Sequence, residues 1–208
     1  MSADTKSMHA VSRRQMLALT ALAPLALAAT PALADTNTDR ATAFMTQMIK
    51  ELTGAVNGPG STADKAVALQ QIIDKAVDVN GIGRFCLGRF WRTASPDEQK
   101  GYIELFHKVL VKNITSKVGD YAGVNIILQK TSARDEGVVV TTSVERTGNA
   151  PAKVDWLLSM DSGNPLVIDV IAEGTSLRLT QRNDYSAFLS SHSNSVTALL
   201  DALKQQAS

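Results

Sequence analysis

Apolar residues recur at helical spacing in the first third of the chain. Phe44, Met48, Leu52 and Ala55 are three or four residues apart, which predicts one apolar face of a helix. Asn57-Gly58-Pro59-Gly60 interrupts this pattern. A second helical stripe follows, formed by Ala66, Leu69, Ile72, Ile73 and Ala76. After Asn80-Gly81, residues 82–91 form a short amphipathic segment, so this region is predicted to be helical throughout.

The strongest local signal is the start of a long helix. Ser95-Pro96-Asp97-Glu98 is a capping box with proline at the first helical position. We predict a helix over 96–118, with Gly119 beyond its end. Its apolar face carries Tyr102, Leu105, Phe106, Val109 and Leu110.

Beyond Tyr121 the apolar period changes from 3.6 to 2. Alternation runs through 124–129, 138–145, 153–160 and 166–173, and turn residues separate these segments. Four strands with short connections predict an antiparallel meander. Further helices follow, one around 184–189 and one with Val196, Leu199, Leu200 and Leu203 on one face. The pattern predicts an α+β fold: an antiparallel sheet of four strands or slightly more, with helices packed on one face.

The N-terminal segment has the features of a cleavable export signal. Arg13 and Arg14 precede an apolar run over 17–29, and Ala32-Leu33-Ala34 supplies small residues for cleavage. A run of about 13 residues is too short for a membrane anchor, which needs about 20. We therefore predict a signal over 1–34 and a single domain over 35–208. The arginine pair resembles a twin-arginine motif, although an ordinary Sec signal can also carry it.

Net charge and cysteine content exclude some classes of function. The whole chain has a formal charge of +1, and the predicted signal carries three basic residues and one acidic residue. The domain that remains is nearly neutral, which argues against a protein that binds nucleic acid or an anionic bilayer by charge alone. Cys86 is the only cysteine, so no internal disulfide can form and the fold must depend on its core. We expect a monomer.

We find no catalytic or metal-binding pattern. His107 and His192 are the only histidines of the domain, and a zinc site needs three or four ligands. Both histidines are predicted to be solvated, and Cys86 is predicted to be a small buried apolar residue. Asp155 and Asp169 fall on the polar phase of their strands and are expected to face outward. The prediction is a protein without catalytic residues, metal or cofactor.

Several separated motifs resemble one family. Residues 82–92, IGRFCLGRFWR, are followed by TASPDEQ at 93–99 and by Tyr102 and Phe106. The strand segments add VDWLL at 154–158, IDV at 168–170 and EGTSL at 173–177. Together these motifs resemble the MlaC family, the toluene-tolerance periplasmic carriers of phospholipid. A related branch occurs in hopanoid gene neighbourhoods, so the resemblance leaves phospholipid and hopanoid open as cargo.

The resemblance implies function as well as fold. It implies periplasmic shuttling of a phospholipid or other polar lipid between an outer-membrane lipid complex and an inner-membrane transporter with an MCE domain. It also implies an apolar cavity between sheet and helices that takes the acyl tails. Head-group contacts are expected at Arg84, Arg89 and Arg92. Candidate tail-binding residues are Phe85, Leu87, Phe90, Trp91, Tyr102, Phe106, Val109, Leu110, Val138, Val140, Val154, Trp156, Leu158, Ile168 and Val170.

Two alternatives stay open at this stage. One is an envelope protein-interaction module whose apolar face docks to another protein. The other is a lipid-modifying hydrolase, which needs a nucleophile with a base. The sequence also leaves open whether the inward side chains enclose a cavity or pack on each other as an ordinary filled core.

Overall fold

The computed structural model describes residues 31–208. Residues 1–30, which contain the Arg13–Arg14 pair and most of the predicted signal, lie outside the described residues. The elements, in chain order, are α1 (Pro31–Asn57), α2 (Thr62–Ala76), α3 (Val79–Leu87), the 3-10 turn η1 (Gly88–Arg92), α4 (Pro96–Thr115), the 3-10 turn η2 (Val118–Tyr121), β1 (Asn125–Arg134), β2 (Gly137–Glu145), β3 (Ala152–Ser159), β4 (Leu166–Ala172), β5 (Thr175–Ser176), α5 (Leu177–Ser191) and α6 (Val196–Ala207).

The strands form one antiparallel sheet in the order β1-β2-β3-β4-β5. The predicted α+β class and the antiparallel meander are confirmed, and the four long strands coincide with the four alternating segments. The sheet has one further strand, β5, which is only two residues long. Two irregularities shift the register, one at Gln129 in β1 and one at Ile168 in β4.

Helix caps form where the sequence places them. The Ser95 hydroxyl accepts a hydrogen bond from the Glu98 amide at 3.2 Å, and the Glu98 carboxylate accepts one from the Ser95 amide at 2.9 Å. Ser61 and Asp64 make the same pair of bonds at the start of α2. The helix α4 stops at Thr115, three residues before the predicted end, and the chain continues through η2 into β1.

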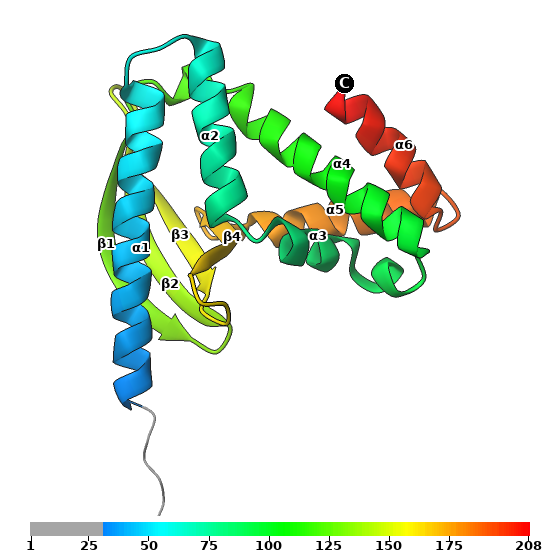
Figure 1. Ribbon diagram of the computed structural model, residues 1–208, viewed down its shortest axis with the longest axis horizontal. Helices are drawn as coiled ribbons and strands as arrows, with labels where there is room; N and C mark the ends of the chain where they lie inside the picture. Colours follow the sequence, from blue (N-terminus) through cyan, green and yellow to red (C-terminus); the bar gives the residue numbers. More distant parts are fainter. Residues whose placement is uncertain (1–30) are drawn as a thin grey trace, which may run out of the picture.

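Two helices cover one face of the sheet. In Figure 1, α1 stands in front of the strands with α2 beside it, and the lower end of α2 approaches β4. The N-terminal part of α1 is fixed to β1 by a hydrogen bond between the Thr42 and Thr131 hydroxyls at 2.7 Å, and its last residue, Asn57, bonds the backbone just before β1. The backbone amide of Asp78, just beyond α2, donates to the Val167 carbonyl of β4 at 3.0 Å. We call the covered side of the sheet its inner face.

The apolar interior is divided into two clusters. The first, here the sheet cluster, joins the inner face to α1, α2 and η2; its fully buried members include Met45, Leu69, Val118 and Val140. The second, here the helical cluster, joins α3, η1, α4, α5 and α6 around Cys86, Tyr102, Phe106, Tyr185 and Leu199. In Figure 1 these helices extend to one side of the sheet.

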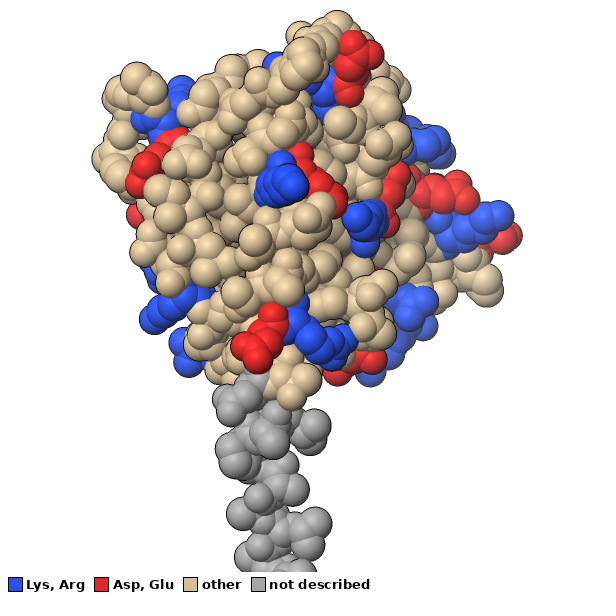
Figure 2. All heavy atoms as spheres, turned by 60° about the vertical axis from the view of Figure 1, so that its left-hand side comes forward, with Lys and Arg blue, Asp and Glu red and all other residues tan. Residues whose placement is uncertain are grey.

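Charges are interspersed on the α1 and β1 side of the molecule. Figure 2 turns this side forward, and acidic and basic side chains alternate there with wide areas that carry neither. No helix within residues 31–208 is both long enough and apolar enough to cross a bilayer.

Candidate functional site: the inner face of the sheet

The inner face has a closed end. Val138, Val140, Leu158 and Val167 are at most 2% exposed, and they pack under α1 and the end of α2. Antiparallel pairing sets Val138 beside Leu158 and Leu158 beside Val167. Because α1 and α2 both reach this end, the side chains here are enclosed on all sides.

The same face is more open along β3 and β4 beyond Leu158 and Val167. Trp156 and Val170 lie in one cross-strand row with the buried Val140, but both are only partly buried. Leu128 of β1, Ile114 of α4 and Tyr121 of η2 are likewise partly buried and pack against the sheet cluster. The sheet therefore presents an apolar strip that is covered at one end and accessible at the other.

The polar atoms within this strip are satisfied internally. The indole Nε1 of Trp156 donates to the Thr142 hydroxyl at 3.0 Å, and that hydroxyl donates to the Val154 carbonyl at 3.2 Å. No buried side-chain nitrogen or oxygen among the described residues lacks a hydrogen-bond partner. An apolar ligand bound on this strip would leave no polar group of the protein without a hydrogen-bond partner, which is a condition for binding acyl chains.

The long helix does not face the sheet as predicted. Tyr102, Phe106 and Val109 of α4 are buried in the helical cluster, where Tyr102 and Phe106 surround Tyr185 with ring centroids 6.1 and 6.5 Å away. The candidate tail-binding residues Phe106 and Leu110 therefore lie in a different cluster from the strand candidates Val140, Trp156 and Val170. The reason is that α1 and α2 occupy the inner face, and α4 packs on α3 and α6 instead.

The other candidate residues before the strands share this location. Leu87 and Phe90 are buried in the helical cluster, and Phe85, Trp91 and Leu110 are partly buried against it. Burial of Tyr102 and Tyr185 raises the pKa of both phenols well above the usual range. The Tyr102 hydroxyl donates to the Gly83 carbonyl at 3.0 Å, so α3 and α4 are joined inside a closed packing.

The alternation in β4 breaks at its bulge. Leu157 pairs with Asp169 and Leu158 pairs with Val167, so Ile168 is left between them without a partner on β3. Val167 takes the inner position that the sequence pattern assigned to Ile168, and the expectation for Ile168 is wrong. Val154 lies on the inner face, partly buried, near the open end.

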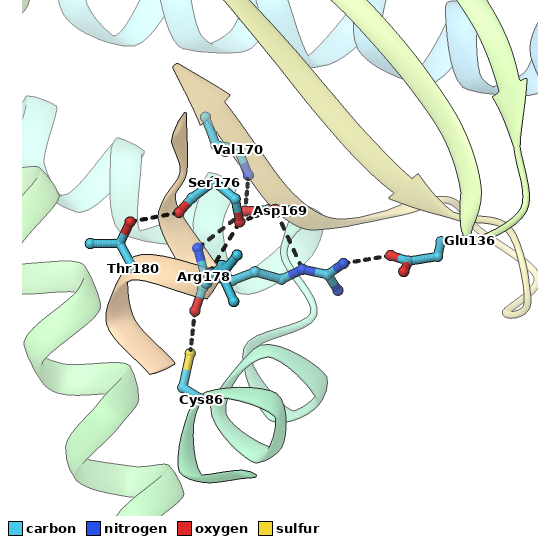
Figure 3. A network of polar contacts seen from close by, with 8 residues as sticks. Cys86, Glu136, Asp169, Val170, Ser176, Arg178 and Thr180 are labelled. Carbon is cyan, nitrogen blue, oxygen red and sulfur yellow. Dashed lines mark hydrogen bonds and ion pairs between the residues drawn. The ribbon is translucent and has the colours of Figure 1, made fainter. Parts of the chain in front are cut away.

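A buried carboxylate lies on the opposite face of β4. Asp169 pairs with Leu157 on that outer face, as its polar phase predicted, but it is only 4% exposed because β5 and the start of α5 fold over it. Figure 3 shows its partners: the Ser176 hydroxyl donates at 2.6 Å, the Arg178 amide at 3.1 Å, and the Arg178 guanidinium lies at 3.4 Å. Arg178 reaches on to Glu136 in the β1–β2 turn at 2.6 Å. The network fixes the sheet to the helical cluster.

The three candidate head-group arginines lie on the helical cluster. The Arg84 guanidinium stacks 5.0 Å from the Trp91 ring, and that of Arg89 stacks 4.8 Å from the Phe90 ring. Arg89 and Arg92 line an open hollow of about 770 Å³ between η1 and the start of α6. All three arginines therefore lie on α3 and η1, which pack in the helical cluster, away from the inner face of the sheet.

No catalytic constellation forms around the candidate nucleophile and bases. Cys86 is 1% exposed, and burial raises the pKa of its thiol to about 12, which disfavours the reactive thiolate. The His107 Nε2 contacts the Asp74 carboxylate of α2 at 2.6 Å, a partner that its own helix did not reveal. His192 stacks on Phe188 with ring centroids 4.0 Å apart. Within residues 31–208, no group of three or more potential metal ligands gathers.

The sequence did not predict that α1 and α2 cover the inner face of the sheet. Their apolar stripes were identified as helix faces, but nothing local shows that Met45, Met48 and Leu69 cover the sheet. The stripe spacing was the available signal, because a helix with an apolar face must bury it against another element.

The fold and this strip define an α+β protein whose sheet offers a half-covered apolar face. The family model of the MlaC protein matches residues 42–205, well over half of the chain. The chain therefore belongs to the MlaC family. A solved structure with the same fold is the phospholipid-binding protein from Ralstonia solanacearum, determined in complex with a phospholipid. It is 20% identical, with a TM-score of 0.68 over 79% of this chain and 95% of that one.

Proposed function

We propose that this protein binds a phospholipid and shuttles it through the periplasm between an outer-membrane lipid complex and an inner-membrane transporter with an MCE domain. Membership of the MlaC family carries this proposal. The similar fold of the Ralstonia protein, which was solved with a phospholipid, supports it. The predicted cleavable signal over 1–34 is consistent with a periplasmic location.

The inner face is the surface we assign to the acyl tails. A diacyl lipid has roughly 30 methylenes, each worth about 0.8 kcal/mol to keep from water, so free passage would cost on the order of 20 kcal/mol. A carrier must therefore cover most of both tails. The strip around Trp156 and Val170 is apolar, free of unsatisfied polar atoms and accessible from one end. Tails that enter there would extend beneath α1 and α2 toward Val140.

Mass spectrometry of the purified mature protein tests the cargo. The protein should be isolated from periplasm without detergent, extracted with organic solvent and analysed against an equal amount of an unrelated periplasmic protein. We expect close to one phospholipid per chain. A stoichiometric hopanoid would keep the carrier role and change the cargo, whereas the absence of any lipid would refute the proposal.

Transfer between membranes tests the shuttling. Donor vesicles with a fluorescent phospholipid are separated from acceptor vesicles by a dialysis membrane that passes the protein but not the vesicles. The delipidated protein should move label to the acceptors. Release of fatty acid from the same lipid would instead indicate a hydrolase.

The export step has its own test. N-terminal sequencing of the periplasmic protein should find Asp35 as the first residue, because Ala32-Leu33-Ala34 matches a cleavage site.

A further inference from the structure

A cluster of unpaired arginines marks a second surface on the molecule. Within the described residues, Arg84, Arg89, Arg92 and Arg182 have no carboxylate within 4.0 Å. All four are exposed. The neighbouring Arg178 differs, because Asp169 and Glu136 neutralise its charge. The stretch 79–96 contains no acidic residue at all.

The four guanidinium groups belong to one continuous face. The Arg182 guanidinium of α5 lies 4.8 Å from the Phe85 ring of α3, and it also borders Gly88 at the start of η1. Arg84 stacks on Trp91, and Arg89 and Arg92 border the same open hollow. We call this surface, formed by α3, η1 and the first half of α5, the arginine face.

Large apolar side chains are exposed beside these charges. Leu177 and Leu179, in the first turn of α5, are 51% and 49% exposed, and Leu179 lies between Arg178 and Arg182 in the helix. Exposed leucines among cations suit the boundary between phosphate groups and acyl chains. A water-facing surface gains nothing from them.

We propose that the arginine face docks on an anionic phospholipid bilayer, with the guanidinium groups on lipid phosphates and with Leu179, which lies one helical turn before Arg182, inserted among the upper acyl carbons. A charge of +4 without internal counter-ions on a nearly neutral chain is complementary to such a surface. Stacking on aromatic rings holds Arg84, Arg89 and Arg182 in place, which lowers the entropy lost on binding. The hollow beside Arg89 and Arg92 has room for a head group. Glu98 also lines it, but this carboxylate is occupied by the Ser95 amide and the Thr197 hydroxyl.

The interaction goes beyond cargo binding and is measured on protein that carries its lipid. Binding is followed by co-sedimentation with vesicles of phosphatidylcholine alone or with 30% phosphatidylglycerol, at low and high salt. We expect binding to the anionic vesicles only, and weaker binding as salt screens the charges. The triple variant Arg84→Gln, Arg89→Gln, Arg92→Gln should bind on the order of 100-fold more weakly, since each basic residue near an anionic surface contributes about fivefold.

A matched control separates the face from net charge. Lys108→Gln, Lys112→Gln, Lys117→Gln removes three exposed charges from the second half of α4 and the turn that follows it, and should weaken binding less than threefold. Circular dichroism and lipid content identify any variant that fails to fold. Leu179→Ser should weaken binding and leave the salt dependence unchanged. Equal loss in the two triple variants, equal binding to neutral vesicles, or capture by immobilised polyglutamate without vesicle binding would each overturn the proposal, the last in favour of an acidic protein partner.

Discussion

A bulky residue at the open end of the inner face distinguishes a lipid site from a filled core. Val170 is partly buried beside Trp156, whereas Val140 on the neighbouring part of the same face is fully buried. We predict that Val170→Trp lowers lipid content while the delipidated protein stays folded. Val140→Trp should instead lower the stability of the delipidated protein.

The magnitudes follow from burial. At Val140 the new ring overpacks an enclosed position, at a cost of about 1–3 kcal/mol or more. For a domain of this size the melting temperature falls by about 2–4 °C for each kcal/mol, so a decrease of about 3–10 °C is expected. At Val170 the ring occupies ligand space equal to roughly three methylenes, each worth about 0.8 kcal/mol. Lipid affinity should fall by roughly 50-fold, with the melting temperature of the empty protein within about 2 °C of wild type.

The assay combines thermal unfolding of delipidated protein with lipid bound per chain after equilibration with vesicles. Ile171→Trp is the matched control, because it adds the same ring one residue along β4, on the opposite face of the sheet. Its lipid content should equal that of wild type. If Val170→Trp destabilises the empty protein as much as Val140→Trp and lipid content is unchanged, the open end is an ordinary core and our assignment of the tails is refuted.

Three further predictions concern stability and reactivity. Asp169→Ala should destabilise the fold by about 3–5 kcal/mol, because it removes the buried carboxylate that accepts from the Ser176 hydroxyl and the Arg178 amide and pairs with the Arg178 guanidinium. Asp155→Ala should cost about 1 kcal/mol. Urea unfolding measures both, and equal costs would contradict the buried network. Ser95→Ala should cost about 1 kcal/mol through loss of the α4 cap, and most of this cost should remain when Glu98→Ala is already present, because the Ser95 hydroxyl accepts from the backbone amide of residue 98; urea unfolding of the single and double variants measures both, and a cost that disappears in the double variant would contradict this assignment. Cys86 should react with a thiol reagent at pH 8 more than 1000-fold more slowly than free cysteine, because burial raises the pKa of its thiol to about 12. Fast labelling of the folded protein would show that the Cys86 thiol is accessible to solvent.

The elements that sequence predicted well are those with local causes. The Ser95–Glu98 capping box spans four residues, and each strand alternation lies within one segment bounded by turns. The helix α5 was underestimated, since only 184–189 was predicted from a helix that begins at Leu177. Leu177 and Leu179 in its first turn are exposed, so this turn lacks the apolar stripe that would predict a helix.

The arrangement of the site depended on contacts between distant segments. Nothing in the alternation of β4 reveals the bulge at Ile168, which places Val167 opposite Leu158, or the covering of Asp169 by β5 and the start of α5. The partner of His107 is Asp74, 33 residues away on another helix. The sequence likewise does not predict that α1 and α2 pack on the sheet and α4 does not, because all three helices carry apolar faces of similar character.

The division into two clusters gives the two proposed surfaces different requirements. Acyl tails need space that opens and refills, and the sheet cluster provides partly buried side chains at one end for this purpose. A docking face needs side chains held in fixed positions. The helical cluster provides such positions, because Phe85, Phe90 and Trp91 support the arginines from a packing closed by the Tyr102–Gly83 hydrogen bond and the Tyr185 ring contacts. The Asp169–Arg178 network connects the two clusters. It ties β4, whose Val170 borders the proposed tail site, to the first turn of α5, whose Leu179 enters the bilayer in our proposal. Cargo and docking can then be altered separately by substitutions within each cluster, whereas a substitution at Asp169 should affect both.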